Sequence, residues 1–197
     1  GISERAMAAS KVAGLQCSFV GWEQMMTVEP QRFPGTTPVH LFYGLETALD
    51  ILEAEGLEAV FTRHERLATA IRAAVRHWGG GAESGIHINE SGLSGSVENL
   101  ELLCADPSRA SNSVTAVLTP TGFDANEFRR LALDRFNLSL GQGLGPLAGK
   151  VFRIGHLGDL NEPMVLGAIA TIELAMRESG MAHISGGTEA ALASLAQ

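Results

Sequence analysis

The sequence predicts an α/β protein whose C-terminal half forms a small α+β domain, an antiparallel sheet covered by helices on one face. Three observations lead to this fold class. Apolar residues recur every three or four positions from Leu41 to Trp78, which is the period of a helix. Beyond residue 100, strand-like and helix-like segments follow one another in the order β-β-α-β-β-α. The 197 residues, of which 45% are hydrophobic and 18% charged, are enough to bury such a core.

The first third of the chain is predicted to be helical and to be interrupted by a loop. Ser3 is a candidate N-cap for a short helix that reaches Ala13. Prolines at three positions between residues 30 and 38 indicate an extended loop. Gly56 interrupts the long apolar period, so residues 41–78 form either two helices or one helix that bends at this glycine.

The remaining elements follow from turn and capping signals. Residues 79–99 are rich in glycine and serine, which predicts an exposed, flexible insertion. The D-x-x-E pattern at Asp124 predicts a helix that reaches Phe136. Asn161, with Pro163 in the first turn, begins a second helix. Strands are expected at residues 100–105, 113–119, 138–140 and 151–157.

These segments define the predicted domain organisation. The C-terminal tail consists mainly of small residues, and we expect it to be only partly ordered. The regions are the edge of a larger domain at 1–40, linking helices at 41–78, the insertion at 79–99, the small domain at 100–178 and the tail at 179–197.

Composition excludes several classes of protein. The net charge is −8 and no basic run is present, which argues against nucleic-acid binding. No segment has the roughly 18 consecutive apolar residues of a membrane span. Cys17 and Cys104 have no metal-type spacing, and the histidines form no ligand pair, so we expect no metal and a reducing, cytoplasmic setting.

The most informative segment for function is the glycine-rich loop from Gly141 that leads into a strand carrying Arg153. An arginine among apolar neighbours is costly unless an anion meets it, and its planar fork binds a carboxylate through two parallel hydrogen bonds. From chemistry alone the anion is either a ligand carboxylate or a local acid such as Asp159 or Glu173.

Other motifs are weaker. Residues 143–148 match G-x-G-x-x-A, but a strand follows where a dinucleotide site needs a helix. Gly149-Lys150 resembles the end of a phosphate-binding loop, but Leu144 and Val151 stand where that motif needs a glycine and a hydroxyl residue. Thr36-Thr37-Pro38 offers either a phosphate contact at a helix start or ordinary turn and capping chemistry.

Separate segments of the chain resemble one known family. They are Phe33–Leu45, Cys104–Pro107, Ser113–Leu118 and Leu147–Asp159. In order and spacing they resemble the C-terminal part of class V, fold type I, pyridoxal-phosphate (PLP) aminotransferases. The serine–glyoxylate and alanine–glyoxylate aminotransferases are the most similar group. The resemblance covers nearly the whole chain except residues 79–99 and the tail.

The resemblance implies a role for each matching position. Residues 1–40 become the end of a PLP-binding domain, and Arg153 becomes the residue that binds the substrate α-carboxylate. Thr36 matches a threonine that reaches the cofactor phosphate across a homodimer. Gly143 and Gly145 would approach the site with their backbone. Phe33 stands where the alanine–glyoxylate relatives have a phosphate-binding tyrosine, which favours the serine–glyoxylate group.

The lysines depart from the family pattern. The family attaches PLP to a reactive lysine, but neither Lys11 nor Lys150 matches that motif. The resemblance therefore implies a fragment that is inactive alone. Its parent enzyme would transfer an amino group from serine, alanine or another donor to glyoxylate. A non-catalytic dimerisation or interaction module derived from the same fold is the alternative, and a class V lyase is a further one.

Overall fold

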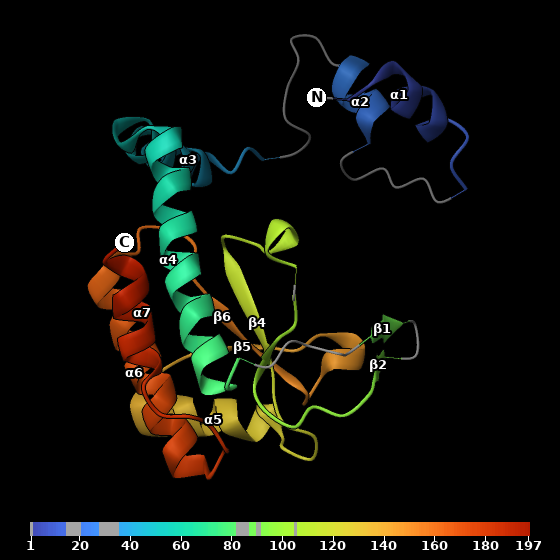
Figure 1. Cartoon of the computed structure of the whole chain (residues 1–197). Helices are drawn as coiled ribbons and strands as arrows, with labels where there is room; N and C mark the ends of the chain where they lie inside the picture. Colours follow the sequence, from blue (N-terminus) through green and yellow to red (C-terminus); the bar gives the residue numbers. More distant parts are fainter. Residues whose placement is uncertain (1, 15–20, 28–35, 82–86, 90–91, 105) are drawn as a thin grey trace. The chain divides into compact units, whose positions relative to one another are not determined.

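The computed structural model describes residues 2–14, 21–27, 36–81, 87–89, 92–104 and 106–197. The chain divides into two compact units, Gly1–Glu55 and Gly56–Gln197. No helix among the described residues is long and apolar enough to cross a membrane. Figure 1 labels most of the helices and strands of each unit.

The first unit contains α1 (Glu4–Ser10), α2 (Trp22–Thr27) and α3 (Val39–Glu55). The Ser3 side chain accepts a hydrogen bond from the Ala6 N–H, which confirms the predicted cap, although the helix ends before Ala13. Helix α3 buries none of its residues. Its exposed apolar side chains include Leu41, Phe42, Leu45, Leu49, Ile51 and Leu52.

Gly56 separates α3 from α4 (Leu57–Trp78), so the apolar period belongs to two helices. The φ angle of Gly56 is 85°, which a glycine adopts without the penalty that a side chain would bring. The boundary between the two units falls at the same residue.

A four-stranded antiparallel sheet forms the centre of the second unit, with the strand order β3-β4-β6-β5. The strands are β3 (Glu101–Leu102), β4 (Val114–Leu118), β5 (Gly141–Gln142) and β6 (Val151–Gly155). The predicted antiparallel sheet is therefore confirmed. β4 and β6 are its longest pair, with Ala116 opposite Arg153 and Val117 opposite Phe152.

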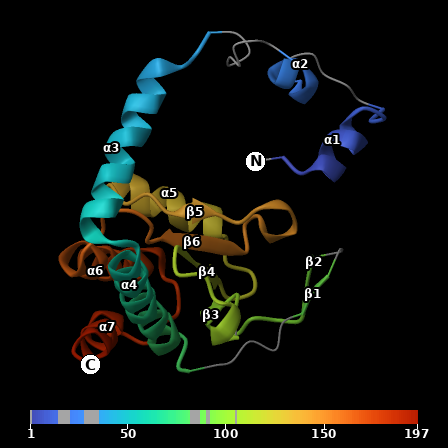
Figure 2. The same cartoon turned by 90° about the horizontal axis from the view of Figure 1, so that it is seen from above.

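The main hydrophobic core lies between this sheet and four helices, as the two views show (Figures 1 and 2). The helices are α4, α5 (Ala125–Phe136), α6 (Glu162–Ser179) and α7 (Gly187–Leu195). Strand residues Leu102, Val117, Phe152 and Ile154 enter this core. Because side chains alternate along a strand, Val151, Arg153 and Gly155 belong to the opposite face of β6.

Part of the predicted insertion has regular structure. β1 (His87–Asn89) pairs with β2 (Gly92–Ser94), and β2 contacts the short 3-10 helix η2 (Gly145–Leu147). Val97, which follows, is buried with Leu118 and Val151 in a small cluster. A segment rich in glycine and serine thus contributes a side chain to the second face of the sheet.

Besides the early end of α1 and the short β3, two further predicted elements differ from the structure. Residues 138–140 are not a strand, because Asn137 takes a left-handed conformation and the Leu138 N–H donates to Ala132 O at the end of α5. The tail, which we expected to be only partly ordered, contains α7, in which Gly187 and Ala191 are buried.

Glu173 of α6 fixes the start of α7. Its Oε2 accepts hydrogen bonds from Trp78 Nε1 (3.0 Å) and the Gly187 N–H (2.9 Å). Its Oε1 accepts from the Gly186 N–H (2.9 Å) and Arg177 Nη2 (3.1 Å). One buried carboxylate therefore joins α4, α6 and the N-terminus of α7, where a negative charge is favoured.

Candidate carboxylate-binding site

Arg153 lies in the middle of β6, between Ala116 of β4 and Gly141 of β5, on the face opposite the helices. Its side chain is partly buried. Of its two cross-strand neighbours, Ala116 has only a methyl group and Gly141 has no side chain. The guanidinium therefore lies on a sheet face where no bulky cross-strand neighbour covers it.

One backbone carbonyl orients the guanidinium. Arg153 Nε donates a hydrogen bond to Gln142 O over 2.9 Å. Within the part of the chain that the structure describes, no carboxylate forms an ion pair with Arg153. Of the acids that the sequence offered, Glu173 is bound by Trp78 and its neighbours instead. The structural ion pair predicted as an alternative is therefore absent from the described residues.

Gly143 and Gly145 shape the loop before β6. The Gly143 N–H donates to Val151 O (3.0 Å), and a Cβ at Gly143 would lie 2.1 Å from Leu147 O. Gly145 has a φ of 53° and begins η2. Local packing accounts for Gly143, and the left-handed backbone conformation accounts for Gly145. Their approach to a cofactor stays a prediction.

Thr36 belongs to the first unit, just before α3, and its side chain is exposed. Pro38 O accepts the N–H of Leu41 and Phe42 in the first turn of that helix. The predicted contact of Thr36 with a phosphate stays a prediction, and Phe33 lies outside the described residues. Lys150 is exposed in the turn before β6, and Lys11 follows the end of α1.

His156 follows β6 and is fully buried. Its Nε2 lies 2.9 Å from Thr115 Oγ1 and its Nδ1 3.1 Å from Asn112 O. Burial lowers its pKa from 6.5 to about 4, so the ring is neutral near pH 7. A neutral ring that donates from Nδ1 and accepts at Nε2 satisfies both contacts, which makes His156 a structural histidine.

Helix α4 holds the loop that leaves β6, a contact that sequence reasoning did not find. Arg63 Nη1 donates to Gly158 O (2.9 Å) and Leu160 O (3.0 Å). The Gly158 N–H donates to His64 Nε2 (3.2 Å), so the proton of that ring is on Nδ1, which donates to Val60 O (2.7 Å). These pairs are separated by more than ninety positions, so only the folded topology brings them together.

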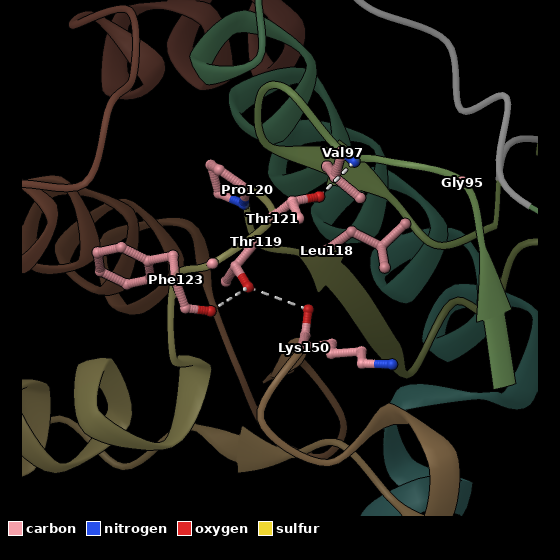
Figure 3. A pocket seen from close by; sticks show the side chains of 9 residues that line it. Gly95, Val97, Leu118, Thr119, Pro120, Thr121, Phe123 and Lys150 are labelled. Carbon is pink, nitrogen blue, oxygen red and sulfur yellow. Dashed lines mark hydrogen bonds between the residues drawn. The ribbon is translucent and has the colours of Figure 1, made fainter.

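A separate cavity of about 170 Å³ lies at the end of β4 (Figure 3). Its polar lining includes Thr119, Thr121 and Lys150. Thr119 Oγ1 donates to Phe123 O and Lys150 O, and Thr121 Oγ1 accepts from the Val97 N–H. Arg153 is not among its lining residues. The described residues contain no cluster of side chains that could hold a metal ion.

Known proteins support the resemblance seen in the sequence. The chain is 39% identical over 194 residues to serine–glyoxylate aminotransferase of Hyphomicrobium methylovorum, covering 96% of this chain and 43% of the relative. It is 40% identical over 182 residues to L-aspartate–glyoxylate aminotransferase of Paracoccus denitrificans, covering 92% and 41%. The Arabidopsis thaliana serine–glyoxylate aminotransferase is 36% identical over 197 residues, covering 99% and 44%. No protein-family model matches the chain.

Solved structures agree with these relatives. Pyridoxamine–pyruvate aminotransferase from Mesorhizobium loti matches with a TM-score of 0.75 and 34% identity, covering 100% of this chain and 46% of that one. Ureidoglycine–glyoxylate aminotransferase from Bacillus subtilis matches with a TM-score of 0.66 and 25% identity, covering 89% and 40%.

Fold and sequence together define a C-terminal portion of the fold type I PLP transferases. The chain belongs with the class V aminotransferases, in the group that contains the glyoxylate aminotransferases. It spans less than half the length of each of these relatives.

Proposed function

We propose that the parent of this chain is a PLP-dependent aminotransferase that moves an amino group from serine, or from alanine, to glyoxylate. The names of the relatives support glyoxylate as acceptor, while their donors differ between serine and aspartate. One structural relative is named for pyruvate. Serine is favoured as donor because two of the three curated relatives named above are serine–glyoxylate aminotransferases.

We assign to Arg153 the binding of the substrate α-carboxylate. The observation that carries this proposal is a partly buried guanidinium with small cross-strand neighbours and no acidic partner among the described residues. A carboxylate that accepts two parallel hydrogen bonds from it would be held in one orientation. The arginine thereby directs the rest of the substrate relative to the reacting centre.

The described residues supply only part of a PLP site. PLP, when bound, supplies the electron sink for amino transfer, but the exposed Lys150 and the helix-terminal Lys11 do not fit the attachment of the cofactor. We therefore derive no step through PLP from this chain. Thr36, before α3, is proposed to contact the cofactor phosphate of the partner subunit.

A homodimeric parent in the cytoplasm completes the proposal. Helix α3 has apolar side chains exposed along its whole length. An exposed apolar surface of this kind is typical of a protein–protein interface, which a second subunit would bury. Cys104 is a free thiol, which suits a reducing compartment.

The test of the Arg153 role is an Arg153→Lys variant of the full-length parent, assayed with serine and glyoxylate. We expect the KM for both substrates to rise about tenfold or more and kcat/KM to fall about a hundredfold, because an ammonium cannot make the two parallel hydrogen bonds. Arg135→Lys is the control, since Arg135 forms an exposed ion pair with Glu178. Unchanged KM values in Arg153→Lys would remove the assigned role.

A further inference from the structure

Gly141 lies directly opposite Arg153 in the antiparallel pair of β5 and β6. A Cβ at this position would lie 3.0 Å from Arg153 Cβ and 3.2 Å from Arg153 Nε. Both separations are shorter than a methyl group normally keeps from its neighbours. The arginine side chain therefore lies across bare backbone of β5. It can do so only because residue 141 is a glycine and has no side chain.

The next residue fixes the direction of the guanidinium. Arg153 Nε reaches Gln142 O at 2.9 Å, next to the Gly141 backbone. A carboxylate can bind a guanidinium in two ways: end-on, through Nη1 and Nη2, or side-on, through Nε and one Nη. Since Nε already donates to the carbonyl, only the end-on edge keeps both of its donors.

We propose that Gly141 is a positioning residue for carboxylate recognition. It lets Arg153 Nε bind Gln142 O, and this bond presents Nη1 and Nη2 end-on to one ligand carboxylate. The proposal rests on the proposed role of Arg153 as the carboxylate-binding residue. A guanidinium held in this way loses less side-chain freedom when the ligand binds. The entropic cost of binding is therefore smaller, and the affinity for the carboxylate is higher.

Gly155 provides a matched control on the same sheet face. It lies two residues after Arg153, and no atom lies within 4 Å of a Cβ built on it. Neither Gly141 nor Gly155 has a positive φ, so alanine strains the backbone at neither position. Gly141→Ala and Gly155→Ala therefore differ chiefly in whether the new methyl group meets Arg153.

The first measurement uses the full 197-residue chain, labelled with ¹⁵N-arginine, and follows the exchange of the Arg153 Nε proton with water by NMR. We expect slow exchange in the wild type and in Gly155→Ala, and exchange faster by about tenfold in Gly141→Ala, because a lost hydrogen bond exposes the proton. Fast exchange in the wild type would overturn the proposal without any substitution.

The second measurement titrates the same proteins with glycolate, an unreactive two-carbon acid. We expect Gly141→Ala to weaken binding about tenfold and Gly155→Ala to leave it unchanged. In the Arg153→Lys background, Gly141→Ala should add no further loss, since it acts only through the arginine. Thermal unfolding of each variant shows that it is folded.

The outcomes separate the two proposals. If Arg153→Lys leaves glycolate affinity unchanged, the carboxylate-binding role of Arg153 is wrong, and the role of Gly141 with it. If Arg153→Lys weakens binding but Gly141→Ala does not, only the positioning role is wrong. An equal loss from Gly141→Ala in both backgrounds also contradicts the positioning role.

Discussion

His156 makes the stability of the fold sensitive to mild acid. Its pKa is about 4 in the folded chain and close to 6.5 when exposed. Between these values the unfolded chain binds a proton that the folded chain does not, so stability falls as the pH drops from 6.5 towards 4. From pH 7 to pH 5 the expected loss is roughly 2 kcal/mol for this residue alone.

Urea unfolding at pH 7 and pH 5 measures this loss. His156→Asn should unfold more easily at pH 7 because of its lost contacts, but with a smaller pH dependence than the wild type. His40→Asn, at an exposed position of α3, should keep the full dependence. A wild-type pH dependence that persists in His156→Asn would show that other groups cause it.

Single residues could be predicted from the sequence when their chemistry demands a partner. Arg153 stood out because an arginine beside apolar residues needs an anion, and its place on a strand was predicted correctly. Arg63 and His64 could not be found, because they contact a loop that lies more than ninety positions further along the chain. A helix pattern says which face is apolar but not which loop meets its polar groups.

At the scale of elements, Glu173 decides whether α7 packs. Burial raises the pKa of Glu173, but the hydrogen bonds from Trp78, Gly186, Gly187 and Arg177 outweigh burial and leave the pKa below its ordinary value. An ionised carboxylate accepts all four bonds. An amide would turn its NH₂ group towards two of the donors, so it cannot replace the carboxylate.

Glu173→Gln should therefore destabilise the chain by about 2–4 kcal/mol in urea unfolding, with faster amide exchange in α7. Glu178→Gln is the matched control on the same helix, because Glu178 forms a more exposed ion pair with Arg135. It should cost less than about 1 kcal/mol. Equal losses in the two variants would refute the anchoring role of Glu173.

Elements with local signals were predicted well, and those without were not. α5 begins after Asp124 and ends at Phe136, where the capping pattern predicted it. β5 is two residues long and carries no strand pattern of its own, because pairing with β6 creates it. α7 was missed for a similar reason: its small residues give a weak apolar face, and Gly187 lies against the Trp78 indole, where a Cβ would be 2.1 Å from Nε1.

At the scale of the whole molecule, the two units differ in how completely their apolar residues are buried. The second unit has its own core, formed by the sheet and four helices, and its fold agreed with the predicted α+β arrangement. The first unit has an α3 that buries none of its residues. An apolar stripe along a helix is normally buried against another element, so the local pattern predicts that helix but not what covers it.

The lysines lead to the final prediction, that the 197-residue chain alone does not transaminate. Amino transfer needs a lysine held beside the cofactor, whereas Lys150 is exposed and Lys11 follows a seven-residue helix. The chain, mixed with PLP, serine and glyoxylate, should form no more glycine than PLP without protein, and Lys150→Arg should behave identically. Glycine formation that disappears in Lys150→Arg would instead identify Lys150 as a reactive lysine, and the assignment of this chain as a non-catalytic portion of its parent would be wrong.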